Sequence, residues 1–211
     1  MLKRLAKTLP IAMGLLMGVG CANMSTLQTA QTLPKGQNEF VVGAGYFTMP
    51  ALNDIASDAA SATGDDTNVA FALPYAEVAF RRGLGENIDA GAKLTLIGTA
   101  AADVKYRFLN SDGFAMAAGL GVGGVQIGGL LLMDVTVPFY MSIDLSDSFA
   151  LYASPKYNLR IIGDQPIHMG GATLGTKIGS DFGAYIEFTY LQFLENFDIP
   201  GVIQVNTALF F

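Results

Sequence analysis

The sequence predicts an all-β fold, a closed antiparallel transmembrane β-barrel of about ten strands. Three of the 12 Lys and Arg residues lie in the first seven positions, and seven of the other nine occupy alternate positions within apolar stretches. Period-two alternation indicates strands with two unlike faces. The segments end in Gly, Asn, Asp and Ser turns, and the chain ends in Phe211. A polar lumen and an apolar outer face account for these observations together.

Residues 1–20 have the pattern of a signal peptide. Lys3, Arg4 and Lys7 precede a short apolar run that is too short to span a bilayer. The single cysteine, Cys21, follows directly, and the preceding Gly-Val-Gly resembles a bacterial lipobox, although that motif usually has Leu at the position of Gly18. We therefore expect a lipidated Cys21, with ordinary cleavage after Ala22 as the alternative.

The polar stretch 21–37 predicts a periplasmic linker, and residues 38–211 predict the barrel. Ten alternating segments follow the linker, near 38–48, 72–83, 87–97, 100–109, 113–125, 132–143, 148–161, 171–179, 183–192 and 201–211. The hairpins near Gly98 and Ile127 are the least marked, so eight or twelve strands are the alternatives. We expect the barrel to close by pairing of the first segment with the last.

The connections between these segments alternate in character. One set is short, as at 84–86, 110–112, 145–147 and 180–182, and has the residues of hairpin turns. The other set is longer on average, at 49–71, 98–99, 126–131, 162–170 and 193–200. Short periplasmic turns and longer outer loops are typical of outer-membrane barrels. An even strand number places both termini in the periplasm, where a lipid on Cys21 would enter the inner leaflet.

The inward positions predict a network of charges in the lumen. Its members are Glu77, Arg81, Asp89, Lys93, Asp103, Lys105, Arg107, Lys156, Arg160, Lys177 and Glu187. Three-residue turns would set Arg81 opposite Asp89 and Asp89 opposite Arg107, with Glu77, Lys93 and Asp103 forming a second belt. Opposed charges of opposite sign stabilise a sheet face. Lys177 is expected opposite Glu187 by a similar count.

Residues 113–133 permit a second interpretation. They carry no charge and are long enough for a membrane helix. The alternation of Gly with Leu and Val favours a strand, whose inward residues from Ala115 to Gly123 are small enough to leave room for long Lys and Arg side chains. Pro138 and Pro155 each remove one ladder hydrogen bond from a predicted strand.

The C-terminal segment GVIQVNTALFF alternates apolar and polar residues. A final strand that ends in Phe, here Phe211, resembles the signal by which the barrel-insertion machinery recognises outer-membrane barrels.

Few residues carry the chemistry of catalysis. His168 lies beside Asp164 in a predicted loop, and no nucleophile motif, metal-ligand spacing or phosphate-binding loop occurs. We expect no cofactor and no metal. Without residues 1–20 the chain has nine basic and 18 acidic residues, which argues against nucleic acid as a partner.

The stretches TAQTLPKGQ, PYAEVAFRRGLGENIDAGAKL, DVKYRF and LYASPKY resemble those of uncharacterised Gram-negative outer-membrane β-barrel lipoproteins. The resemblance covers most of residues 21–160, and it implies an outer-membrane location without an assigned activity. The chain resembles the omptin proteases only in strand number, because their catalytic Asp and His residues have no counterpart here.

These observations predict a non-enzymatic protein of the outer membrane, in contact with its lipid and with the insertion machinery. It would act as a membrane anchor, a small pore that passes small solutes, or a component of envelope structure. Two alternatives remain open: an outer-membrane enzyme, a hydrolase or acyl-modifying enzyme, with a rim site near His168, and a surface-recognition barrel that uses the loop 49–71.

Overall fold

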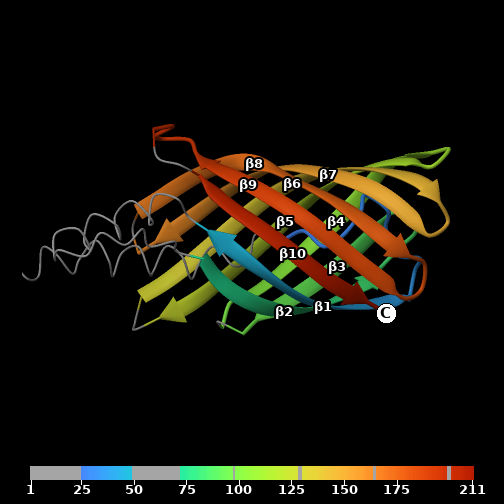
Figure 1. Cartoon of the computed structure of the whole chain (residues 1–211), viewed down its shortest axis with the longest axis horizontal. Coiled ribbons are helices and arrows are strands. Elements are labelled where there is room, and N and C mark those ends of the chain that lie inside the picture. The colour runs from blue at the N-terminus through green and yellow to red at the C-terminus, as the bar shows by residue number, and fades with distance from the viewer. Residues whose placement is uncertain (1–24, 49–71, 97, 128–129, 164, 199–200) are drawn as a thin grey trace, which may run out of the picture.

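A computed structural model describes residues 25–48, 72–96, 98–127, 130–163, 165–198 and 201–211. In this part of the chain, ten antiparallel strands form a closed barrel with steeply tilted strands (Figure 1). The strands are β1 (Asn38–Thr48), β2 (Ala72–Gly83), β3 (Ile88–Thr95), β4 (Ala100–Ser111), β5 (Phe114–Ile127), β6 (Leu130–Ser146), β7 (Phe149–Ile162), β8 (Gln165–Gly179), β9 (Gly183–Phe193) and β10 (Val202–Phe210). The predicted fold class is confirmed.

The barrel closes between its first and last strands, as the sequence predicts. Val42 pairs with Leu209 and Gly45 with Asn206. The pairing continues past β10, because the Phe211 amide donates to the Phe40 carbonyl at 3.0 Å and the Phe40 amide donates to the Phe211 carbonyl at 2.9 Å. Every strand therefore has two neighbours, and no edge is left unpaired.

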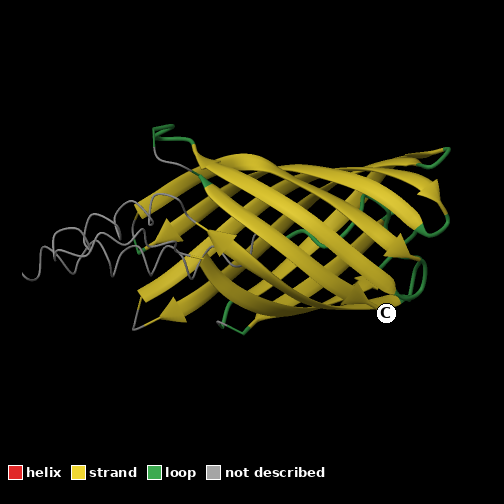
Figure 2. Cartoon of the chain, viewed as in Figure 1, coloured by secondary structure: helices red, strands yellow, loops and turns green. Residues whose placement is uncertain are grey.

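Short turns lie at one end of the barrel, here called the turn end, together with the C-terminus (Figure 2). The β4–β5 hairpin shows how the sequence makes such a turn. Asp112 and Gly113 both have positive φ, at 43° and 81°, which is the geometry that an Asp-Gly pair adopts in a two-residue hairpin. The opposite end is called the loop end.

Two strands on the loop-end side are longer than predicted. β6 begins at Leu130 and β8 at Gln165, so the predicted loops 126–131 and 162–170 shrink to short connections. His168 therefore lies in a strand, paired with Leu159, and not in a loop. Residues 49–71 lie outside the described residues.

The outer face of the barrel is apolar around its whole circumference. Exposed side chains of this face include Val42, Val78, Leu94, Val104, Leu120, Val137, Leu151, Leu174, Ile186 and Val205. Aromatic residues cluster near the turn end, where Phe40 lies 4.9 Å from Phe80 and 6.1 Å from Phe211 between ring centroids. An apolar band bordered by aromatic rings is the surface that lipid requires.

The alternative of a membrane helix at 113–133 is wrong, because β5 and β6 occupy those residues. Nor does any helix among the described residues have the length and hydropathy to cross a bilayer.

Replacing Leu120 tests whether the outer face contacts hydrocarbon. Leu120 is half-exposed, lies near the middle of β5 and pairs with Val104. In lipid vesicles, Leu120→Arg is expected to lower the free energy of unfolding by about 2–4 kcal/mol, because a charge at mid-bilayer must leave water. Leu84→Arg, at the turn end, is expected to cost at most about 1 kcal/mol. Equal losses for the two variants, measured by urea titration, would contradict a lipid-facing band.

Candidate functional site in the barrel lumen

The chain before β1 lies inside the barrel. Residues 25–33, here called the plug, run through the lumen toward the turn end, and Ser25, Leu27 and Ala30 are buried there. The sequence predicts a periplasmic linker over residues 21–37, and this is wrong for residues 25–33, which lie in the lumen. The segment is free of charge from Ser25 to Pro34, so its burial costs no charge desolvation.

A tight turn leads from the plug into β1. The Gln37 amide donates to the Pro34 carbonyl at 3.0 Å, and Gly36 has a φ of 84°, a conformation that favours glycine. Gly36 and Gln37 then pair with the end of β2, through two hydrogen bonds to Gly83 of 2.8 and 2.9 Å. A Cβ on Gly83 would overlap the carbonyl oxygens of Leu33 and Pro34, so only glycine lets the turn lie this close.

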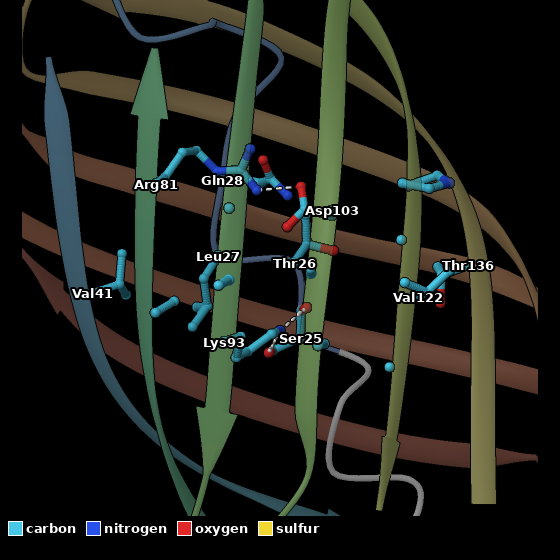
Figure 3. A pocket seen from close by; sticks show the side chains of 18 of the residues that line it. Ser25, Thr26, Leu27, Gln28, Val41, Arg81, Lys93, Asp103, Val122 and Thr136 are labelled. Atoms are coloured by element: carbon cyan, nitrogen blue, oxygen red, sulfur yellow. Dashed lines mark hydrogen bonds and ion pairs between the residues drawn. The ribbon is translucent and has the colours of Figure 1, made fainter. Parts of the chain in front are cut away.

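Asp89 is the centre of one charged cluster. Its carboxylate binds the Arg81 guanidinium, lies 3.4 Å from the Lys105 ammonium and accepts the Leu33 amide at 3.2 Å. Arg81 also binds Asp103 (Figure 3). Asp89 has no exposed side-chain surface, so these partners replace water entirely.

The predicted cross-strand register is wrong by two residues in both hairpins. Arg81 pairs with Gly91, and Asp89 pairs with Lys105. The Arg81–Asp89 ion pair forms diagonally because an arginine side chain is long enough to reach it. Asp89 takes Lys105 as its second cation in place of Arg107.

Lys93 and Glu77 form a second cluster deeper in the lumen. Their charged groups lie 3.4 Å apart, and Ser25 lies between them: its hydroxyl donates to Glu77 at 2.7 Å and accepts from Lys93 at 2.7 Å. Lys93 also donates to the Ser25 carbonyl at 2.8 Å (Figure 3). Lys93 therefore does not pair with Asp103.

Glu187 binds the main chain of the plug. Its carboxylate accepts the amides of Thr26, at 2.9 Å, and Leu27, and the Tyr152 hydroxyl donates to it at 2.7 Å. Leu27 has a φ of 47°, so the two successive amides converge on one anion in the geometry of a backbone nest. Glu187 pairs with Gly175 across the sheet, and the predicted Lys177–Glu187 pair does not form.

The remaining cations of the predicted network also face the lumen. Lys105 donates to the carbonyls of Thr29 and Gln31 at 2.9 and 2.7 Å, Arg107 donates to the Gln31 side chain at 2.6 Å, and Lys156 donates to the Thr26 hydroxyl at 3.0 Å. Arg160 binds Asp134 at 2.8 Å, and Lys177 lies 3.9 Å from Glu39 and 4.4 Å from the centre of the Phe210 ring.

Small wall residues make room for the plug. Ala30 packs against Ala115, Ala117 and Tyr140, so the space beside β5 holds the plug and an aromatic side chain. Gly119 and Gly121 lie on the same wall, and a Cβ at Gly119 would lie 3.1 Å from the Tyr140 ring. The free space at the level of Ser25–Gln28 is a cavity of about 90 Å³, room for several water molecules.

The sequence did not predict the plug or its contacts with uncharged residues of the barrel wall. Gln28 donates to the Tyr140 hydroxyl at 3.0 Å, and Leu27 inserts between Val41, Tyr152, Tyr185, Ala208 and Phe210. The uncharged composition of 25–34 and the small residues of β5 are the two signals that could have indicated an occupied lumen.

His168 and Phe211 lie outside the lumen. The His168 ring contacts the Tyr157 hydroxyl, its Nε2 lies 3.8 Å from Glu195, and its amide donates to the same carboxylate at 2.7 Å. Phe211 faces outward beside Phe40. Cys21 lies outside the described residues. No three metal-ligating side chains lie together in the part of the chain that the structure describes.

Comparisons with known proteins find similar structures but no relatives by sequence. No family model and no curated protein matches this chain. The translocator domain of autotransporter NalP from Neisseria meningitidis is 11% identical, with a TM-score of 0.43 and coverage of 99% of this chain and 97% of that one. An outer membrane channel from Pseudomonas putida F1 is 11% identical, with a TM-score of 0.48 and coverage of 88% and 98%. The outer membrane protease OmpT from Escherichia coli is 11% identical, with a TM-score of 0.36 and coverage of 86% and 98%.

Removing the Asp89 carboxylate tests the first charged cluster. Asp89→Ala leaves Arg81 and Lys105 facing each other and leaves the Leu33 amide without its acceptor. Loss of one partner from a buried charge network costs about 3–5 kcal/mol, less where lumen water reaches the cations. The folded band of this variant on gels is expected to unfold at a lower temperature than that of the wild type.

Asp147→Ala is the matched control, because Asp147 is exposed in the β6–β7 turn. It is expected to keep the heat resistance of the wild type. Similar losses in both variants would mean that Asp89 does not stabilise the barrel through its lumen contacts.

Proposed function

We propose that this chain is a non-enzymatic outer-membrane β-barrel whose lumen is closed by its own N-terminal plug, so that it serves as a membrane anchor in its resting state. The observation that carries the proposal is the set of contacts between the plug main chain and four charged side chains, the buried Glu187, Lys105 and Asp89 and the half-buried Lys93. A mobile loop would not supply main-chain partners to buried charges along nine residues.

The outer face supports a location in a membrane. Its apolar side chains surround the barrel, and the aromatic residues near the turn end match the position of an interfacial girdle. Lipid of the outer membrane would be the partner of this face. The barrel-insertion machinery would be a transient partner, recognising the strand that ends in Phe211.

A small pore is the second state that the lumen permits. If the plug left, Lys93, Lys105, Lys156 and Glu187 would line a polar channel. In the closed state the cavity beside Ser25–Gln28 is only about 90 Å³, whereas cavities of about 370 and 560 Å³ flank the plug at the turn end. The plug would therefore limit conduction at its deepest part.

Conductance in planar bilayers tests closure. The wild type is expected to give no steady current. Gly83→Ala is expected to open the barrel, at least intermittently, because its new methyl group would displace the main chain at Leu33 and Pro34. Gly121→Ala is the matched control, since a Cβ there would have ordinary contacts, the nearest at 3.5 Å.

Steady current through the wild type would contradict closure by the plug and would indicate an open pore instead.

The non-enzymatic part of the proposal has its own test. His168 contacts Tyr157 and Glu195 on the outer face. Hydrolysis of lipid or peptide by the wild type that is lost in His168→Ala would overturn it in favour of a rim enzyme.

Lipidation at Cys21 is the proposed second attachment to the membrane. Cys21 precedes Ser25 by four residues, which span at most about 14 Å when extended. Ser25 itself is buried in the lumen, so an acyl group on Cys21 would have to reach lipid within that length of chain.

Cys21→Ser is expected to abolish acyl labelling in cells while the barrel still fractionates with the outer membrane. The barrel strands, and not the lipid, would hold the protein there. Absence of label from the wild type would mean ordinary signal cleavage, and loss of the barrel from the outer membrane in the variant would make the lipid the main anchor.

A further inference from the structure

We propose that the lumen is a binding site for an extended, uncharged peptide of a separate chain, which it recognises through main-chain contacts and two side-chain pockets. The plug is then the ligand of this site held within the same chain. This inference rests on the proposed closure and goes beyond it, because it assigns a ligand class to the lumen.

The wall contacts the plug chiefly through atoms that every peptide has. Four charged side chains bind six main-chain groups: Lys93 binds the Ser25 carbonyl, Glu187 the amides of Thr26 and Leu27, Lys105 the carbonyls of Thr29 and Gln31, and Asp89 the Leu33 amide. Charge-assisted hydrogen bonds of this kind are about twice as strong as neutral ones. They fix the path of an extended chain and do not depend on its sequence.

Two pockets add selectivity. Leu27 is buried among Val41, Tyr152, Tyr185, Ala208 and Phe210, and the absence of a side chain at Gly43 leaves the space for its Cδ1. Ala30 is fully buried against the alanines of β5 and Tyr140, where a larger side chain would not fit. The site therefore selects an aliphatic residue followed three positions later by a small one.

The wall also selects against charge. Arg81 and Lys105 share Asp89, Lys93 pairs with Glu77, and Arg160 pairs with Asp134. A charged peptide residue buried beside these pairs would lack a partner, and such burial is costly. The plug follows this rule, with only Ser, Thr, Gln, Ala and Leu in residues 25–33.

A separate chain has a route to the site at the turn end. Cavities of about 370 and 560 Å³ flank the plug there, lined by Gln31, Lys177 and Ser180 among others. The only covalent link between the plug and the barrel at this end is the turn at Pro34–Gln37, in which Lys35 is exposed. Cutting the chain there would convert the plug into a free peptide without removing any wall residue.

The test is peptide exchange in the folded barrel. A protease site is inserted between Lys35 and Gly36 of the full chain, the purified barrel is cut in detergent, and a fluorescent peptide STLQTAQTLPK is added. We expect the cut barrel to bind it, measured by fluorescence anisotropy. The uncut barrel is expected to bind it at least about 100-fold more weakly, because its tethered plug competes at an effective concentration of millimolar order.

Peptide variants test the recognition rules. An aspartate in place of the leucine at the position of Leu27 is expected to weaken binding at least about 100-fold, through lost burial and an unpaired charge. Tryptophan at the position of Ala30 and a scrambled peptide of the same composition are expected to bind as weakly. In the barrel, Glu187→Gln is expected to weaken binding about 10-fold through loss of the charge-assisted bonds.

The full-length Leu27→Asp protein supplies an uncut acceptor, because its own plug fits poorly. Binding of the peptide by neither the cut wild type nor this variant would overturn the inference, as would equal binding of the scrambled peptide. Failure of closure itself is seen separately, as steady current through the uncut wild type in bilayers.

Discussion

Charges placed inside a narrow barrel need partners, and the rest of this structure follows from how they find them. A barrel of ten strands is only slightly wider than one whose side chains fill its interior. Asp89 and Glu187 have almost no exposed surface, and each must replace its water by protein donors. The wall supplies some of these donors, and the main chain of residues 25–33 supplies the others.

The plug therefore stabilises the charged side chains of the barrel wall, just as these side chains hold the plug in place. Lys105 lies beside Asp89 on the neighbouring strand and also donates two hydrogen bonds to plug carbonyls. Glu187 accepts hydrogen bonds from two plug amides. The residues directly opposite it on the neighbouring strands, Gly175 and Asn206, are uncharged. A main chain carries both donors and acceptors, so one extended segment can satisfy ammonium and carboxylate groups alike.

The strand number and the β1–β10 closure were predictable because alternation is a local signal with period two, whereas the loop-end starts of β6 and β8 were not. Nearly all lumen charges were predictable for the same reason. The cross-strand partners of these charges were not predictable. A shift of two residues in a hairpin keeps every side chain on its face of the sheet but changes which residue lies opposite. Arg81, for example, lies opposite Gly91. The place of residues 25–33 was not predictable either, because a polar segment without periodicity reads equally well as a linker.

The balance of forces on the plug indicates that closure depends on few residues. If the plug left, water would enter the lumen and solvate Lys93, Lys105 and Glu187, so the net contribution of each main-chain hydrogen bond is modest. Leu27 adopts a positive φ, which costs a non-glycine residue about 1–3 kcal/mol. Burial of its side chain contributes about 1.5–3 kcal/mol, which is of the same order. What remains to hold the plug is the burial of Ala30, the charge-assisted bonds to its main chain and the turn at Gly83, so closure rests on these three features.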